Sequence, residues 1–401
     1  MKKVIIVGGG IIGQFSAYYL AKSGHEVTIV DDSPKMTPAS EGNCALVTPS
    51  HIIPLNSFSA IFQGIKWLRK KDAPLKIKPQ LDKRFMLWFL NFMRYSQSSH
   101  IDKATHARHA LLQQSFKLYE SFFQEESNQS EWKKGGLLYA CRKEESMGQF
   151  AHEIDVHRKF NMNNSRMLSK DEILAREPLL KPDVVGGVIM EMDGWLNPAQ
   201  LLQDLKKINE GNGVTYIQAK AASFSTKNSE IQSIKTDQGE LEGDEFVLAA
   251  GALSPLLTRK LGIKIPVIPG KGYNLTTVNE SFPLKQPLYM VERRVVATPW
   301  EKGFRIGSTM EFAGYNLDLT KSRLDALRRA ASEYLEIELQ DLEMKPWTGW
   351  RPMKDNGIPI IERSKIKNLT IATGHSMVGL SMAPATGFIV NEILSSPISD
   401  Q

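Results

Sequence analysis

Three glycines near the N-terminus have the spacing that nucleotide binding requires. Gly8-x-Gly10-x-x-Gly13 follows the apolar run Val4–Val7 and precedes apolar residues at helical spacing. In such a strand–turn–helix unit the first glycine forms the turn, the second lets a pyrophosphate approach the backbone, and the third packs helix on strand. Because the helix N-terminus then faces the phosphate charge, the pattern predicts a dinucleotide site.

A carboxylate at the end of the next predicted strand narrows the choice of nucleotide. Asp31 closes the apolar run Val27–Val30 and follows Gly13 by 18 residues. A carboxylate there can accept a hydrogen bond from a ribose hydroxyl and repels a 2′-phosphate, so FAD or NAD is favoured over NADP. The motif does not separate FAD from NAD. The predicted cofactor-binding set at this end also includes Ile11, Ile12 and Asp32.

A second glycine-bracketed turn lies near the C-terminus. Thr373 to Gly387 enters a predicted helix of small and apolar residues. A helix N-terminus can stabilise negative charge on the N1–C2=O edge of a reduced flavin, a need that nicotinamide does not have. Ordinary helix capping explains the same residues, so this turn favours FAD only in combination with other motifs.

Further motifs make the chain resemble a known family over nearly its whole length. It resembles the glycine oxidase, sarcosine oxidase and D-amino-acid oxidase superfamily, and within it the bacterial D-amino acid dehydrogenases. Beside the N-terminal glycines, the matching motifs are Ser40-x-x-Asn43, Ile65-Lys66-Trp67, Ala73-Pro74-Leu75, Gly270-Lys271-Gly272-Tyr273, Trp350-Arg351-Pro352-Met353, Gly357-x-Pro359 and Thr373-Gly374-His375.

The resemblance implies an FAD site assembled from separate segments. Ser40 and Asn43 would lie on the loop that passes the pyrophosphate and the isoalloxazine, and Ala222 would present its backbone to adenine, where the family more often has valine. Some relatives attach the flavin through a cysteine near the Arg351 segment. No cysteine follows Cys141 here, so we expect non-covalent FAD. The remaining expected cofactor contacts are Cys44, Ala250, Gly251, His375, Gly379, Leu380, Ser381 and Met382.

The resemblance also assigns the substrate contacts. Arg351 corresponds to the family's carboxylate-binding arginine, and its planar guanidinium matches a carboxylate in bidentate fashion. Tyr273 is a second candidate for the same carboxylate, with core packing as its alternative role. His375 is expected to be a turn histidine near the flavin rather than a base, because relatives of this kind pass a hydride from the α-carbon to flavin N5.

The implied activity is oxidation of a D-amino acid to an imine, which water converts to a 2-oxo acid and ammonia. Electrons would leave through a quinone or another carrier. Three alternatives remain open at this point: a D-proline or hydroxyproline dehydrogenase, an oxygen-using amino acid oxidase of the glycine or sarcosine oxidase type, and a flavin-binding electron-transfer subunit without a substrate site.

The elements that position these residues predict an α/β fold with a discontinuous Rossmann-like domain. Asn197 and Pro198 begin a helix that leads, through a small antiparallel excursion, to a buried strand at Phe246–Gly251 that closes on small residues. Polar alternation at Gly187–Met192 and Gly303–Thr309 is typical of an antiparallel sheet. We therefore expect a FAD-binding domain of residues 1–50, 196–260 and 349–401, and an inserted antiparallel-sheet substrate domain of residues 51–195 and 261–348.

Composition and charge exclude several classes of protein. Two distant cysteines indicate neither a disulfide framework nor a metal site. No run of 18 apolar residues occurs, and Met1-Lys2-Lys3 leads directly into a short strand, so a cytoplasmic protein is expected. The net charge of +6 is concentrated in Ala60 to Tyr95, where nine Lys and Arg residues meet two Asp residues. A local patch of this kind argues against a nucleic-acid binder.

This basic stretch interleaves its cations with Trp67, Phe85, Trp88, Phe89, Phe92 and Tyr95. Such a pattern could hold the protein to the anionic inner face of a membrane. Amphipathic packing of helices on the substrate domain is the alternative.

Overall fold

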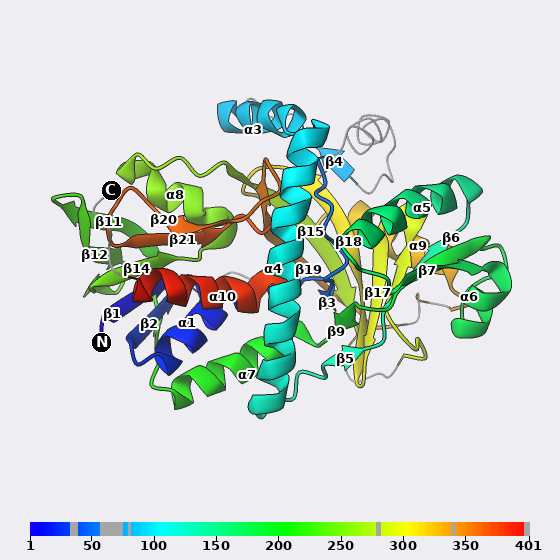
Figure 1. The fold of residues 1–401 in the computed structure, drawn as a ribbon, viewed down its shortest axis with the longest axis horizontal. Helices are drawn as coiled ribbons and strands as arrows, with labels where there is room; N and C mark the ends of the chain where they lie inside the picture. The colour runs from blue at the N-terminus through cyan, green and yellow to red at the C-terminus, as the bar shows by residue number, and fades with distance from the viewer. Residues whose placement is uncertain are drawn as a thin grey trace.

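The computed structural model describes residues 1–32, 39–56, 75–78, 82–277, 282–337, 339 and 342–396. Two large sheets lie side by side, and the helix α4 (Ser98–Glu125) runs across the junction between them (Figure 1). The motif segments Ile65-Lys66-Trp67 and Ala73-Pro74 fall outside the described residues.

The first sheet contains the predicted nucleotide-binding strands. Its six strands are ordered β10-β2-β1-β14-β21-β20, all parallel except β20. The strands predicted at Val4–Val7 and Val27–Val30 are confirmed, and the strand predicted at Phe246–Gly251 is present but ends at Leu248. The bounds are β1 (Lys3–Val7), β2 (Glu26–Asp31), β10 (Thr215–Gln218), β14 (Glu245–Leu248), β20 (Ile360–Arg363) and β21 (Leu369–Thr373).

Apolar layers cover both faces of this sheet. On one face, α1 (Ile11–Lys22) and α10 (Gly379–Ser395) bury Ala17, Leu20 and Val390 against the strands. The other face is covered by the predicted antiparallel excursion, β11 (Ala221–Lys227), β12 (Glu230–Thr236) and β13 (Gly239–Glu242). The helix predicted after Asn197 is α7 (Pro198–Gly211), and the Asn197 side chain caps it by accepting from the Gln200 N–H at 3.2 Å.

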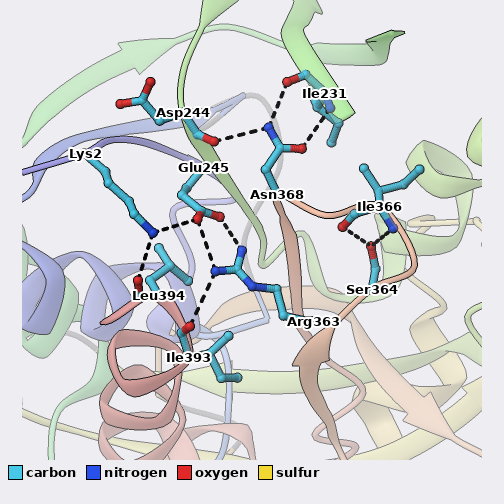
Figure 2. Close-up of polar contacts among 10 residues, drawn as sticks. All are labelled: Lys2, Ile231, Asp244, Glu245, Arg363, Ser364, Ile366, Asn368, Ile393 and Leu394. Carbon is cyan, nitrogen blue, oxygen red and sulfur yellow. Dashed lines mark hydrogen bonds and ion pairs between the residues drawn. The ribbon is translucent and has the colours of Figure 1, made fainter. Parts of the chain in front are cut away.

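Ion pairs stabilise the end of this sheet that lies opposite the glycine turn. The buried Glu245, at the start of β14, pairs with Lys2 and Arg363, which also donate to carbonyls at the end of α10 (Figure 2). The side chain of Asn368 bridges β12 and the Asp244 carbonyl in the same region. These contacts join β14, β20 and α10 into one unit.

The second sheet has nine strands, ordered β19-β15-β18-β17-β16-β6-β8-β7 with β4 beside β18. Most of its pairs are antiparallel, as Gly187–Met192 and Gly303–Thr309 predicted. The bounds are β4 (Leu75–Ile77), β6 (Leu137–Cys141), β7 (Ser165–Ser169), β8 (Gly186–Met190), β15 (Val267–Thr276), β16 (Leu288–Met290), β17 (Val295–Trp300), β18 (Gly303–Phe312) and β19 (Lys345–Lys354).

The remaining elements surround this sheet. The helices are α3 (Lys83–Arg94), α5 (Glu144–Lys159), α6 (Lys170–Arg176), α8 (Ser254–Thr258) and α9 (Lys321–Tyr334), with short 3-10 turns η1 (Gly251–Leu253), η2 (Arg259–Leu261) and η3 (Val291–Arg293). A small sheet joins β3 (Leu46–Val47), β9 (Gly194–Trp195) and β5 (Lys133–Lys134). None of the described helices is both long and apolar enough to cross a membrane.

Two features depart from the expected division of the chain. Residues 349–354, assigned by sequence to the nucleotide-binding part, complete β19 of the nine-stranded sheet, because β19 pairs along its whole length with β15. Helix α4, assigned to the inserted part, packs Tyr119 and Phe122 against Phe15 and Tyr18 of α1. Both segments therefore join the two sheets.

Candidate functional site

The glycine turn between β1 and α1 leaves no room for side chains. Gly8 has φ +112°, and a Cβ there would lie 2.5 Å from the carbonyl oxygen of Ala249. A Cβ on Gly13 would lie 1.9 Å from the carbonyl oxygen of Gly8. The backbone of the turn can therefore come as close to a bound group as the fingerprint requires.

The loop after β2 closes over the first turn of α1. Gly10 caps this helix without a side chain, and the Ser40 hydroxyl accepts from the Ile11 N–H at 2.9 Å. Asn43 in turn donates to the Ser40 carbonyl at 2.6 Å. Ser40 and Asn43 are thus held at a helix N-terminus, where backbone N–H groups and the helix dipole favour an anion such as a pyrophosphate.

The carboxyl ends of the parallel strands meet at this turn. The Asp31 carboxylate accepts from the Gly9 N–H at 2.6 Å, and Asp32 follows it. The end of β14 also reaches the turn, since the carbonyl of Ala249 lies against Gly8, and the Gly251 carbonyl next along the chain accepts from Thr373 at 3.0 Å. Ala222 is an exposed residue of β11, three residues beyond Ala219, whose N–H donates to the Asp31 carbonyl at 3.0 Å. The tight glycine cradle and the adjoining carboxylate fit a dinucleotide such as FAD.

A cavity of about 800 Å³ extends from this region into the nine-stranded sheet. Five of the predicted cofactor and substrate contacts line it: Asn43, Cys44, Arg351, Leu380 and Ser381. Its other walls come from β6, β16 and α5, which belong to the part of the chain expected to bind substrate.

Arg351 presents its guanidinium to this cavity. The side chain crosses Gly272, where a Cβ would lie 2.5 Å from the guanidinium carbon, and Nη1 donates to the Thr309 carbonyl at 3.0 Å. Burial lowers the pKa of Arg351, and the neighbouring Cys44 thiol opposes that shift. Among the described residues no carboxylate forms an ion pair with Arg351, so its charge is available to an anion.

The N-terminus of α10 faces the same cavity. Val378, Leu380 and Ser381 line it, and the Ser381 hydroxyl accepts from the Thr48 N–H at 2.9 Å. The Leu380 carbonyl accepts from the Tyr119 hydroxyl at 2.8 Å, which anchors this end of the helix to α4. The positive end of the helix dipole is therefore directed at whatever occupies the cavity.

Three further candidates lie behind this surface. His375 bonds through Nε2 to the Thr386 hydroxyl at 3.0 Å, and burial lowers the pKa of His375 to about 3. A neutral imidazole bonded within the fold suits a structural role. Gly379 begins α10 beside His375. Met382, also on α10, has a fully buried side chain.

The structure does not bring Tyr273 to Arg351. Successive residues of a strand point to opposite faces, and Gly272 already faces the guanidinium, so Tyr273 points away from it. The Tyr273 hydroxyl donates to Glu311 at 2.5 Å within a fully buried environment. The geometry supports the packing role of this tyrosine and gives it no contact with a substrate carboxylate.

Sequence reasoning missed two sets of residues. Arg305 donates to the carbonyls of Glu41 and Asn43 at 2.8 and 2.7 Å, and so fixes the loop over the glycine turn. The cavity is also lined by polar residues from α5, β6 and the turn after η3: Tyr139, Glu153 and Arg294. No local motif marks these residues, because they come together only through pairing of distant strands.

Comparison with known proteins finds a family model and relatives that match almost the whole chain. The family model described as "DAO: FAD dependent oxidoreductase" matches residues 3–393. A D-amino acid dehydrogenase of Vibrio vulnificus (strain CMCP6) is 27% identical over 405 residues, covering 99% of this chain and 97% of that protein. Glycine oxidase from Bacillus cereus ATCC 14579 has a similar structure, with a TM-score of 0.75, 20% identity and coverage of 98% and 97%. L-proline dehydrogenase from P. horikoshii gives a TM-score of 0.72, 20% identity and coverage of 99% and 94%.

Proposed function

The chain belongs to the DAO family of FAD-dependent oxidoreductases, and we propose that it oxidatively deaminates a D-amino acid. The substrate loses a hydride from its α-carbon, and the resulting imine is hydrolysed to a 2-oxo acid and ammonia. Relatives named D-amino acid dehydrogenase that span the whole chain support this reading. As in a dehydrogenase, a quinone or another carrier would then take the electrons.

We assign the FAD to the cradle at the carboxyl ends of β1, β2 and β14. The backbone at Gly8, Gly10 and Gly13 would make room for the pyrophosphate, and the Asp31 carboxylate would accept a hydrogen bond from a ribose hydroxyl. The N-terminus of α10 would face the flavin ring. When FAD is bound, its flavin would supply the acceptor for the hydride. The six-stranded sheet would thus form the FAD-binding part, and the nine-stranded sheet the substrate-binding part.

The observation that carries this proposal is the position of Arg351. A guanidinium without a carboxylate partner among the described residues lines a cavity next to the predicted flavin site. Bidentate bonding to the α-carboxylate would hold the α-carbon at a fixed distance and orientation, which is what hydride transfer needs. A subunit that only carried electrons would have no need of such a group.

The proposal is tested by mixing the protein with D- and L-amino acids in the absence of oxygen. Loss of the visible flavin absorbance with D-amino acids is the expected result. Readmitting oxygen, or adding a quinone, then distinguishes an oxidase from a dehydrogenase by which of the two restores the colour.

We further propose that α3 contacts an anionic membrane surface. This helix packs Phe85, Trp88 and Phe92 on the sheet, and the Trp88 indole donates to the Met353 carbonyl at 2.9 Å. Its opposite face exposes Met86, Leu87 and Leu90 by 53%, 60% and 55%. Figure 1 shows α3 at the edge of the molecule, where a flat surface could reach it.

Changing Leu87 and Leu90 to Asp should therefore weaken binding to anionic vesicles at low salt. Lys83 and Arg94 flank the exposed apolar face, so both charge and apolar burial contribute in the parent protein. Co-sedimentation measures the effect, and salt should weaken binding because the Debye length falls to about 8 Å at physiological ionic strength. Leu256→Asp, at an exposed site of α8, is the matched control. If the parent protein stays in the supernatant when anionic vesicles are pelleted at low salt, the proposed membrane contact is wrong.

A further inference from the structure

Strand β18 has an irregularity in the wall of the cavity that contains Arg351. Its register with β15 shifts between Tyr273 and Asn274, and Ser308 is left without a partner across the ladder. An extra residue of this kind forms a β-bulge, a feature that is common next to active sites, where it redirects a side chain. Ser308 is one of the residues that line the cavity.

The backbone of Ser308 is strained. Its φ is +107°, the largest among the described non-glycine residues whose φ is positive. This value lies outside the small left-handed region that residues with a side chain tolerate, whereas glycine adopts it readily. A glycine stands one position earlier, at Gly307, yet the strained position carries a hydroxyl. Strain of this kind persists where the surrounding structure enforces it, and it is concentrated at functional sites.

Ser308 forms one wall of the cavity together with Cys44 and Arg351. The Ser308 hydroxyl contacts the Cys44 thiol, which also contacts the Arg351 guanidinium. A Cβ on the neighbouring Gly307 would lie 3.3 Å from the Cys44 sulfur, so the bulge lies directly against the loop that contains Cys44. On its other side, the carbonyl of Thr309 accepts from the Arg351 guanidinium at 3.0 Å. The bulge therefore places a hydroxyl beside the guanidinium.

This hydroxyl keeps most of its hydrogen-bonding capacity for a ligand. Within the described part of the chain, its one side-chain partner is the Cys44 thiol, which is a weak donor and a weak acceptor. Burial raises the pKa of Cys44, so the thiol stays neutral and does not compete with a substrate anion for Arg351. A carboxylate offers about four acceptor positions, which is more than one guanidinium fills.

We propose that Ser308 is a second substrate-binding residue, whose hydroxyl donates to the α-carboxylate that Arg351 binds. The inference rests on the proposed function and adds a contact at the same site. A donor besides those of the guanidinium would restrict rotation of the carboxylate, and so help to hold the α-carbon in the orientation that hydride transfer needs. The bulge would keep the hydroxyl in this place although its backbone conformation costs stability.

Two variants separate the effect of the hydroxyl from the effect of the strain. Ser308→Ala removes the hydroxyl and keeps the strained Cβ, whereas Ser308→Gly removes both. In both FAD-loaded variants the KM for the best D-amino acid should rise about 5- to 20-fold with kcat within about twofold, because the bond to the carboxylate forms before the hydride moves. The Kd of the matching 2-oxo acid, titrated through the visible flavin spectrum, should rise by a similar factor. The thermal unfolding midpoint of Ser308→Gly should lie about 1 to 3 °C above that of Ser308→Ala, because glycine relieves the strain.

Ser229 provides the matched control. It is an exposed serine with φ +61° in the turn between β11 and β12, and it does not line the cavity. Ser229→Ala should therefore leave the KM and the Kd of the 2-oxo acid within about twofold of the parental values.

The outcomes separate this inference from the function on which it rests. Parental KM and parental affinity for the 2-oxo acid in FAD-loaded Ser308→Ala would overturn the carboxylate contact while leaving D-amino acid oxidation intact. Loss of FAD from this variant in place of a higher KM would also overturn it, because the hydroxyl would then serve the cofactor. A Ser308→Gly protein that unfolds at or below the midpoint of Ser308→Ala would remove the strain on which the inference depends. If no D-amino acid bleaches the flavin, the proposed function fails and the inference fails with it.

Discussion

Replacement of Arg351 by leucine is expected to lower kcat/KM for the best amino acid by roughly 10² to 10⁴. The substrate carboxylate would then enter the cavity without a partner, at a cost of about 3 to 5 kcal/mol. Steady-state kinetics on the purified, FAD-loaded variant measures the loss. FAD content should stay at the parental level, because Arg351 is assigned to the substrate.

Two comparisons make this result specific. Arg351→Lys should recover only part of the loss, because an ammonium keeps the charge but does not reproduce the planar pair of donors. An amine without a carboxylate should be a poor substrate of the parent. Its kcat/KM should change little when Arg351 is replaced by leucine. Near-parental kcat/KM in Arg351→Leu would show that the residue is structural and that the substrate binds elsewhere.

Gly13→Ala is expected to abolish stable FAD binding. The added Cβ would lie 1.9 Å from the Gly8 carbonyl oxygen, so the turn must move away from the position that the pyrophosphate needs. An overpacking cost of about 3 kcal/mol corresponds to a loss of roughly 100-fold in affinity. The readout is FAD per polypeptide after acid precipitation, which should release intact FAD from the parent because its attachment is expected to be non-covalent.

Gly211→Ala is the matched control, since a Cβ at this position of α7 meets no atom within 4 Å. It should keep both FAD content and thermal stability. Full FAD loading of Gly13→Ala would place the cofactor outside the glycine turn, and flavin retained in the protein pellet of the parent would contradict non-covalent attachment.

Sequence reasoning succeeded where local chemistry decides the structure. The turn at Gly8–Gly13 and the cap at Asn197 depend on residues within a few positions of one another, and both have the expected form. Arg351, which the family resemblance singles out, also lines the cavity. These features need no knowledge of distant contacts.

The rest depends on tertiary pairing. Which face of β15 carries Tyr273 follows from its register with β19, which no local pattern reveals. Arg305 reaches the loop at Glu41 across more than 260 residues of chain. Tyr139, Glu153 and Arg294, which line the cavity, similarly come from three separate segments and are brought together only by the fold.

The central claim is that a D-amino acid reduces the flavin of this protein. Absorbance spectroscopy in the absence of oxygen measures this reduction directly. Enantiomeric pairs of amino acids should be mixed with the oxygen-free holoenzyme. The account predicts that the D-enantiomers bleach the visible flavin band and yield ammonia and a 2-oxo acid, while the L-enantiomers leave the band unchanged. Bleaching by the L-enantiomers alone, or by no amino acid of either series, would contradict it.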